Sequence, residues 1–408
     1  MAPLIRTLRS VLRFRKFETN SALRRLSRAA SVGDLRRIAQ RQLPGGIFDY
    51  IDGAAEDERS LYNNSAAFSR LEFKPSVLCD VSQIDTRTTL LGHELPFPLA
   101  LSPTGFTRIA NSQGELAVAR AAQRAGLPYT LSSLSTYSIE EVAAVSRASK
   151  WFQVYVWKDR GLVKELLDRS AESGYEAIVI TVDTPVLGRR DRDARSGFTL
   201  PPQIGLDTII SGITHPGWTL DFLRGGPITF ANLVGRSGED GSDAINLAEY
   251  TQQLFDPRLS WSYLDWFRDN WKGPIVLKGV QSVEDAQLAA DAGVQAVALS
   301  NHGGRQLDDS PAPLELVQPV ADAVGDRVEI ICDGGIQRGS DILKALALGA
   351  RCCMTGRAYL YGLGAGGERG VDHAIDLLRQ GLERTMALTG QSSVKNLKPD
   401  LVARKAHQ

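Results

Sequence analysis

Short apolar runs recur along the chain from about residue 95 and predict a series of buried β-strands. Segments with helical periodicity separate most of them. The eight runs are Pro98–Leu101, Pro128–Leu131, Trp151–Val156, Ala177–Val182, Pro274–Leu277, Ala296–Leu299, Val328–Cys332 and Cys352–Thr355. Strands that alternate with helices are typical of a parallel sheet, and eight parallel strands are the number that closes a (β/α)8 barrel.

The segments between the runs support this reading. Gly114–Ala125 is rich in alanine and Val283–Ala292 has helical periodicity, while Ser340–Leu348 opens on a serine that can cap a helix. We therefore predict an α/β protein, a TIM barrel preceded by an N-terminal helical segment. The barrel domain is expected to span residues 34–400, between an arm of residues 1–33 and a tail of residues 401–408.

One connection is too long for a simple crossover between two strands. About seventy residues lie between Arg190 and Ser260, and Pro201-Pro202, Pro216-Gly217 and Gly225-Gly226 interrupt them. We interpret residues 191–260 as an excursion over the barrel mouth that is partly a lid and partly a contact surface.

Composition narrows the class of protein. The 408 residues are 43% hydrophobic and 23% charged, which is ordinary for a globular chain and excludes a disordered or collagen-like one. No apolar run approaches the ~18 residues of a membrane-spanning helix. The four cysteines, Cys79, Cys332, Cys352 and Cys353, show no CxxC spacing, so we expect free thiols in a reducing compartment and neither a haem attachment site nor an iron–sulfur cluster.

The net charge of zero conceals a basic N-terminus. Residues 1–42 hold eleven Lys and Arg against two acids, Glu18 and Asp34. Within residues 1–20 a helical projection places leucines and a valine on one face and arginines on another, which suits an anionic membrane surface. A solvated arm and an organelle transit peptide are the alternatives. We do not expect nucleic-acid binding, because the body has no second basic block.

Polar residues stand at the end of every predicted strand, where a (β/α)8 barrel carries its chemistry. In order, these ends are Ser102-Pro103-Thr104-Gly105, Ser132-Ser133, Gln153 with Tyr155, Thr181-Val182-Asp183, Lys278, the loop from Ser300 to Arg305, Asp333-Gly334-Gly335 and Thr355-Gly356-Arg357. All eight are expected to converge on one mouth.

The last two ends predict a phosphate site. Gly334-Gly335 and Gly356-Arg357 offer backbone N–H groups and a cation after strands seven and eight, where barrel enzymes usually hold a phosphate. Glycine matters here because a Cβ would keep the backbone away from the phosphate oxygens.

The ends of the middle strands carry a titratable base and two cations. His302 and Arg305 share one short loop, which suits a substrate with a carboxylate to bind and a proton to lose. Asp183 could orient the imidazole or simply cap a turn. Lys278 could form a Schiff base or place a positive charge beside an electron-accepting ring, and the sequence leaves these two roles open.

Several motifs together resemble the FMN-dependent L-2-hydroxy acid oxidases and dehydrogenases, most of all the actinobacterial quinone-linked L-lactate dehydrogenases. The resemblance covers residues 34–400. The motifs are FDYIDGAAED at 48–57, PTG at 103–105, QVY at 153–155, TVDTPVLGRR at 181–190, LKGV at 277–280, SNHGGRQLD at 300–308, DGG at 333–335, KALALGA at 344–350 and TGRAYLYG at 355–362.

The resemblance implies specific roles at the mouth. Residues expected around the flavin and its ribityl chain are Pro103, Thr104, Gly105, Ser132, Gln153, Thr181, Lys278 and Ser300. The ribityl and phosphate end is assigned to Asp333, Gly335, Gly356 and Arg357. The substrate carboxylate is assigned to Tyr50 and Arg305 with Arg190, the 2-hydroxyl to Tyr155, and the base to His302 with Asp183 behind it.

Two positions depart from the family pattern. Gln337, followed by Arg338, stands where most members have arginine, so a cation near the phosphate is either missing or supplied by Arg338. Gly105 stands where many oxygen-using members have alanine, which favours a dehydrogenase. Leu134 is expected to border the pocket for the substrate side chain and to suit lactate better than mandelate.

The expected reaction is oxidation of a small L-2-hydroxy acid, most of all L-lactate to pyruvate, with FMN as cofactor. A quinone or another diffusing electron carrier is the expected acceptor, and oxygen with release of hydrogen peroxide is the alternative. Rivals of another class are a Schiff-base aldolase that uses Lys278 and a non-catalytic flavoprotein. We expect a homo-oligomer, a tetramer by resemblance, peripheral on the inner face of the cell membrane.

Overall fold

The computed structural model describes residues 21–196, 212–233 and 255–405. The predicted amphipathic helix of residues 1–20 therefore lies outside the described residues, as do residues 197–211 and 234–254 of the predicted excursion. Within the described chain, no helix combines the length and the hydropathy that crossing a membrane requires.

Eight of the described strands are parallel and close into a barrel in the order β10-β11-β4-β5-β6-β7-β8-β9. Their bounds are β4 (Leu99–Leu101), β5 (Tyr129–Ser132), β6 (Lys150–Tyr155), β7 (Ala177–Thr181), β8 (Ile275–Val280), β9 (Ala296–Ser300), β10 (Glu329–Asp333) and β11 (Cys352–Thr355). Each overlaps one predicted run, so the predicted (β/α)8 barrel is confirmed. The strand register aligns the carboxyl ends, since Thr181 pairs with Lys278 and Asp333 pairs with Ser300.

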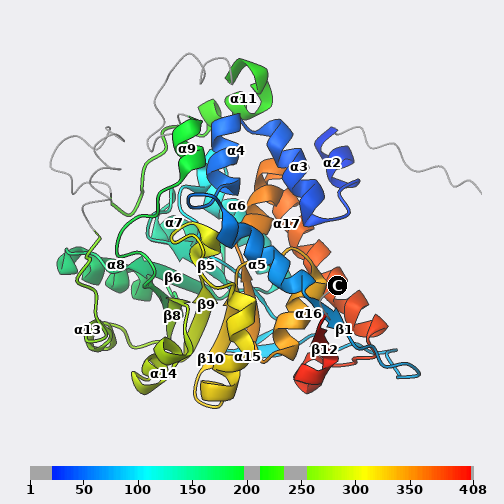
Figure 1. Ribbon diagram of the computed structural model, residues 1–408. Coiled ribbons are helices and arrows are strands. Elements are labelled where there is room, and N and C mark those ends of the chain that lie inside the picture. The colour runs from blue at the N-terminus through cyan, green and yellow to red at the C-terminus, as the bar shows by residue number, and fades with distance from the viewer. Residues whose placement is uncertain (1–20, 197–211, 234–254, 406–408) are drawn as a thin grey trace, which may run out of the picture.

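Helices cover the outside of the barrel (Figure 1). They are α6 (Gly114–Ala125), α7 (Ile139–Val145), α8 (Arg160–Glu172), α13 (Tyr263–Asn270), α14 (Val283–Asp291), α15 (Pro313–Val324), α16 (Gly339–Ala347) and α17 (Arg357–Leu388). The predicted cap of α16 is wrong. Arg338 is the N-cap and Ser340 lies inside the helix, because the carboxylate of Asp341 accepts the backbone N–H groups of Gln337 and Arg338.

Four described helices precede the barrel strands in the sequence. They are α2 (Ser21–Leu26), α3 (Val32–Gln42), α4 (Gly45–Asp52) and α5 (Arg59–Ser69). Ser31 starts α3 by accepting the N–H of Asp34. Leu26 and Val32 are buried, so the packed body already includes residues before the predicted boundary at residue 34.

Two small antiparallel sheets lie outside the barrel wall. The strand β1 (Leu71–Phe73) pairs with β12 (Val402–Arg404), so part of the predicted tail of residues 401–408 is a strand rather than a free end. The hairpin of β2 (Thr88–Leu90) and β3 (His93–Leu95) buries Leu90 and Leu95 in one cluster with the inward side chains of the barrel strands. This hairpin therefore closes the barrel floor.

The cysteines match the predicted pattern. Cys332, Cys352 and Cys353 are buried and Cys79 is exposed, and all four are free thiols. Burial raises the pKa of Cys332, Cys352 and Cys353 above the ordinary value, so these thiols stay protonated.

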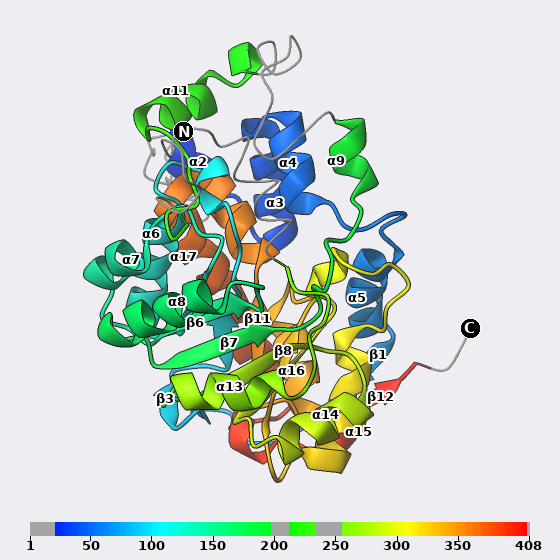
Figure 2. The ribbon, with the colours of Figure 1, turned by 90° about the vertical axis from the view of Figure 1, so that its left-hand side faces the viewer.

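In the described parts of the excursion, α9 (Asp191–Arg195) packs against α4, and α11 (Pro216–Arg224) docks on the loop that follows β4 (Figure 2). The indole Nε1 of Trp218 donates to the carbonyl of Ile109 at 2.8 Å, at the end of the short 3₁₀ helix η1 (Thr107–Ile109). The backbone N–H and the hydroxyl of Ser112 both donate to Asp221 at 2.7 Å.

Candidate active site

One cavity of about 980 Å³ lies at the mouth of the barrel, between the strand ends and the helices α3, α4 and α9. The predicted site residues that line it are Tyr50, Pro103, Thr104, Gly105, Tyr155, Arg190, Lys278, His302, Arg305, Asp333, Gly334, Gly335, Gly356 and Arg357. The remaining predicted residues, Ser132, Gln153, Thr181, Asp183 and Ser300, are not among the described lining residues. Ser132, Gln153, Thr181 and Ser300 are buried beneath the lining, and the Asp183 side chain is 1% exposed.

His302 and Asp183 form a hydrogen-bonded pair at the mouth. Nδ1 of His302 lies 2.9 Å from Oδ1 of Asp183, whose side chain is 1% exposed. His302 also has a φ of 59°, in the left-handed region that a side chain rarely adopts. The backbone N–H of His302 donates to Ser300 Oγ at 3.1 Å. Hydrogen bonds therefore hold His302 in an otherwise unfavourable conformation.

Two guanidinium groups flank the ring of Tyr50. The Arg190 guanidinium lies 5.5 Å from the ring centre and that of Arg305 lies 5.0 Å from it. Arg305 donates from Nη1 to the carbonyls of Tyr50 at 2.7 Å and Gly53 at 2.9 Å. Burial, with the positive charge of Arg190 nearby, lowers the pKa of Arg305 to about 9. A bound carboxylate would relieve this electrostatic cost, so the site favours an anion.

Lys278 and Asp333 form a buried ion pair on the floor of the site. Nζ of Lys278 lies 3.1 Å from Oδ2 of Asp333 and donates to Ser300 Oγ at 3.2 Å. Asp333 also accepts the hydroxyls of Ser102 and Ser300. Burial disfavours the charged form of Lys278, but the attraction of Asp333 and Asp183 outweighs it and raises the pKa of Lys278. The ammonium group therefore stays protonated.

A chain of side-chain hydrogen bonds links the ends of three neighbouring strands. Ser132 Oγ donates to Gln153 Oε1 at 3.0 Å, and Gln153 Nε2 donates to Thr181 Oγ1 at 3.0 Å. The same Ser132 hydroxyl accepts the N–H of Leu134, which lines the cavity. These buried polar groups form a fixed array beneath the cavity.

The predicted phosphate end has the glycine geometry that it requires. Gly334 and Gly335 have φ values of 145° and 77°, and Gly356 is the N-cap of α17. Backbone N–H groups at such a helix start are suited to a phosphate. The Arg357 side chain, however, donates to the carbonyls of Ile51, Gly53 and Gly303.

Gln337 and Arg338, which stand where the family pattern has an arginine, differ in whether they line the cavity. Gln337 lines the cavity and its amide nitrogen lies 3.4 Å from Ser65 Oγ. Arg338 caps α16 and is not among the described residues that line the cavity. The alternative in which Arg338 replaces the missing cation has no support in this arrangement.

Sequence reasoning gave no role to Gln306, although it lies within the SNHGGRQLD motif. Its amide nitrogen donates to the carbonyls of Asp183 at 3.2 Å and Val186 at 3.0 Å, and its oxygen accepts the N–H of Gly188 at 3.0 Å. Gln306 therefore joins the loop that carries Asp183 to the loop that carries His302. The position of Gln306 within this polar motif does not indicate that its side chain reaches the loop of Asp183.

Comparisons with known proteins identify the family of the chain. A family model described as FMN-dependent dehydrogenase matches residues 39–404. A Mycobacterium tuberculosis protein, provisionally named L-lactate dehydrogenase, is 44% identical over 398 residues, which cover 97% of this chain and 94% of that one. An L-lactate dehydrogenase of Caulobacter sp. is 42% identical over 379 residues, which cover 92% and 98%.

Two further relatives differ in their named activity. An L-lactate oxidase of Nostoc sp. is 41% identical over 378 residues, which cover 91% of this chain and 97% of that one. Among solved structures, the monotopic membrane protein (S)-mandelate dehydrogenase superposes with a TM-score of 0.88 at 37% identity, and the match covers 93% of this chain and 100% of that one.

Proposed function

Because the chain belongs to the FMN-dependent dehydrogenase family, we propose that it oxidises a small L-2-hydroxy acid, with L-lactate as substrate and pyruvate as product. The observation that carries this proposal is the placement of one base and one anion site in a single cavity. His302, paired to Asp183, lines the same cavity as Tyr50, Arg190 and Arg305. A 2-hydroxy acid has the proton and the carboxylate that such a site can take.

The residues at the mouth fit FMN. The positive-φ glycines Gly334 and Gly335 and the start of α17 offer N–H groups for a phosphate, and Asp333 offers carboxylate oxygens for ribityl hydroxyls. Lys278 offers a buried positive charge and Gln153 an amide for the polar edge of the ring. When bound, FMN would supply the two-electron acceptor for the hydride that leaves the substrate Cα.

Different side chains bind the substrate and take its proton. Arg305 and Arg190 bind the carboxylate beside Tyr50. Tyr155 forms a hydrogen bond with the 2-hydroxyl. Nδ1 of His302 is occupied by Asp183, so Nε2 takes the hydroxyl proton as the C=O bond forms and the Cα hydrogen leaves with its electron pair as hydride. Asp183 stabilises the imidazolium that forms. Fixing both ends of the substrate lowers the barrier by several kcal/mol, up to about 7–11 in well-oriented systems.

The ion pair of Lys278 supports this chemistry over a Schiff-base aldolase. An amine must lose its proton before it can attack a carbonyl, and Asp333 keeps Lys278 protonated. A fixed ammonium group suits the stabilisation of negative charge on a reduced ring.

The position of Leu134 supports a small substrate side chain. Leu134 lines the cavity beside Gly105, where an added Cβ would lie 3.2 Å from both the Leu134 Cβ and its carbonyl oxygen. The relatives named for L-lactate point to the same substrate class.

For the acceptor we propose a quinone or another non-oxygen carrier. The relatives named dehydrogenases favour it, and Gly105 in place of alanine agrees. Oxygen is the second candidate, because a relative that is 41% identical is named an L-lactate oxidase.

We further propose that the enzyme is a homotetramer that docks on an anionic membrane surface through residues 1–20. The monotopic membrane relative supports the docking. So does α11, which lies at the same end of the molecule as α3 and α4 (Figure 2) and whose Leu220 and Leu223 are 54% and 69% exposed.

The visible spectrum of the purified protein under anaerobic conditions tests the proposed reaction. L-lactate should bleach the flavin band and D-lactate should leave it unchanged. A flavin band that no small L-2-hydroxy acid bleaches would contradict the proposed reaction. A protein that takes up no FMN on reconstitution and is trapped with a substrate by borohydride would support the aldolase instead.

A further inference from the structure

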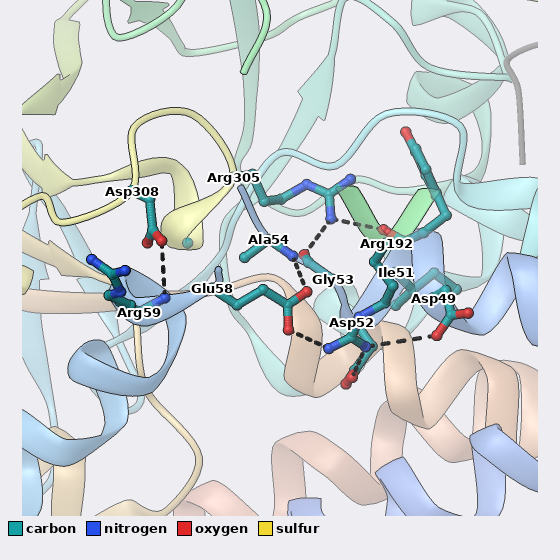
Figure 3. A network of polar contacts seen from close by, with 12 residues as sticks. Asp49, Ile51, Asp52, Gly53, Ala54, Glu58, Arg59, Arg192, Arg305 and Asp308 are labelled. Carbon is teal, nitrogen blue, oxygen red and sulfur yellow. Dashed lines mark hydrogen bonds and ion pairs between the residues drawn. The ribbon is translucent and has the colours of Figure 1, made fainter. Parts of the chain in front are cut away.

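A cluster of charged side chains joins α9 to α4 in the wall of the cavity (Figure 3). Nη1 of Arg192 donates to Oδ2 of Asp52 at 2.8 Å, and Nη2 of Arg192 donates to Oε2 of Glu58. Asp49 lies 3.7 Å from the same guanidinium group. One arginine of α9 thus contacts three carboxylates on or just after α4.

Asp52 is the buried centre of this cluster. Its side chain is 4% exposed, and it also accepts Nε and Nη2 of Arg36 at 2.6 and 2.7 Å and the hydroxyl of Tyr361 at 2.7 Å. Burial alone would raise the pKa of Asp52, but the hydrogen bonds from Arg36, Tyr361 and Arg192 lower it to about 2. Asp52 is therefore ionised across the working pH range.

Glu58 connects the cluster to the backbone that holds Arg305. Its Oε1 atom accepts the N–H of Ala54 at 3.0 Å while its Oε2 atom accepts Arg192. The preceding carbonyl, that of Gly53, accepts Arg305 at 2.9 Å and Arg357 at 2.8 Å. Figure 3 shows Arg192 and Arg305 on opposite sides of this short backbone segment.

Among the described residues, α9 has few other contacts that hold it. It is five residues long and buries none of its own side chains. A helix this short is not stable by itself. Its N-cap is Arg190, whose guanidinium group lies over the ring of Tyr50. The partners of the cluster thus stand two residues after the substrate-binding residues, Arg192 after Arg190 and Asp52 after Tyr50.

We propose that Arg192 is a positioning residue, which fixes α9 against α4 so that Arg190 and Tyr50 meet the substrate carboxylate together. The proposal rests on the proposed function, since it takes the carboxylate site from there. A solvated surface ion pair would have no such effect. Here the carboxylates of Asp52 and Glu58 are 4% and 11% exposed, and Arg192 is 27% exposed.

The test compares Arg192→Gln with the matched control Arg195→Gln. Arg195 lies on the same short helix, is 74% exposed and pairs only with Asp191 among its described partners, at 3.5 Å. We expect Arg192→Gln to keep its FMN, to raise KM for L-lactate about 10-fold and to change the limiting rate of flavin reduction less than about 3-fold. Arg192→Lys should recover part of the affinity, and Arg195→Gln should match wild type.

Two further measurements keep the proposal falsifiable. Glu58→Gln removes one partner of Arg192 but keeps an oxygen for the Ala54 N–H, so it should raise KM in the same direction with a smaller effect. Oxalate titrated against the flavin absorbance reports carboxylate binding without turnover. A flavin that L-lactate fails to bleach in wild type would refute the proposed function, while oxalate would still report on Arg192. Equal KM and equal oxalate affinity in Arg192→Gln and Arg195→Gln would overturn the role of Arg192.

Discussion

Asp183 and His302 are 119 residues apart in the sequence, yet Oδ1 of the carboxylate lies 2.9 Å from Nδ1 of the imidazole. The contact joins the end of β7 to the end of β9, and β8 lies between them in the barrel. Because both strands are fixed in the wall, the orientation of the imidazole is set by the fold before any substrate arrives.

Replacing His302 by glutamine should keep FMN bound and slow flavin reduction by L-lactate about 10²–10⁴-fold, because the proton acceptor is lost. Asp183→Asn should show a smaller loss, since the base remains but its orientation and charge balance suffer. Anaerobic stopped-flow absorbance measures both rates. Turnover near the wild-type rate in His302→Gln would exclude it as the base.

Gly279→Ala should disturb Asp183 from the neighbouring strand. Gly279 has a φ of 102°, and an added Cβ would lie 2.8 Å from the Cβ and Cγ of Asp183. We expect a loss of stability of about 1–3 kcal/mol and a fall in flavin reduction of about 10²-fold. Gly174→Ala is the control, because its φ of 74° is similar and nothing lies within 4 Å of the added Cβ. Equal activity in the two variants would argue against a role for the contact.

Lys278→Met should unfold more easily and lose FMN. Removing one partner of a buried ion pair leaves Asp333 uncompensated and costs about 3–5 kcal/mol. Asp333→Asn in the same chain should restore part of that stability. Chemical unfolding of the apoproteins, together with their FMN content after reconstitution, measures the effect. Free-energy changes that simply add in the double variant would show that the two side chains do not interact.

The affinity for substrate should fall at high pH. The pKa of Arg305 is about 9, so its positive charge is present below that pH and is lost as the pH rises through it. KM for L-lactate should therefore increase above about pH 9, while kcat is less affected because the bound carboxylate raises the pKa of Arg305. Steady-state profiles across this range test the expectation, and a KM that stays constant well above that pH would contradict it.

Deleting the N-terminal arm and replacing the exposed leucines of α11 should weaken membrane binding in two distinguishable ways. Deleting residues 2–20 removes five Lys and Arg and one acid, and each cation near an anionic surface contributes about 1 kcal/mol. Vesicle binding should then lose its salt dependence. Replacing Leu220 and Leu223 by asparagine should weaken binding at every salt concentration. If neither change affects vesicle sedimentation or quinone-linked turnover, the proposed docking is wrong.

The barrel and its mouth could be predicted from the sequence because each strand carries its own local signal. Runs such as Ala177–Val182 are apolar and β-branched, and the polar residue that follows marks where the strand ends. In a parallel barrel all such ends meet on one face, so His302, Lys278 and Asp333 could be placed together without coordinates.

The contacts that fix these residues could not be predicted in the same way. Asp52 and Arg192 are 140 residues apart, and Gln306 reaches across to the backbone of a loop about 120 residues earlier. Neither pair has a periodicity or a spacing that reveals it. The pairing of β1 with β12 is equally non-local, since three residues near the end of the chain carry no strand signal of their own.

The prediction of the N-cap of α16 was wrong for a different reason. A serine at residue 340 suits an N-cap, but Asp341 can accept two backbone N–H groups at once and so moves the start of the helix back to Arg338. Two capping residues next to each other in the sequence leave the first residue of a helix undecided.

The hairpin beneath the barrel has a consequence for how this chain can change over time. Leu90 and Leu95 share one buried cluster with inward residues such as Val179 and Ile331, and the reacting groups stand at the opposite end of the barrel strands. Stability and chemistry are thereby assigned to opposite ends of one scaffold. Substitutions around the hairpin can raise or lower the resistance to unfolding while the mouth keeps its selectivity, which gives evolution and the protein engineer two independent controls.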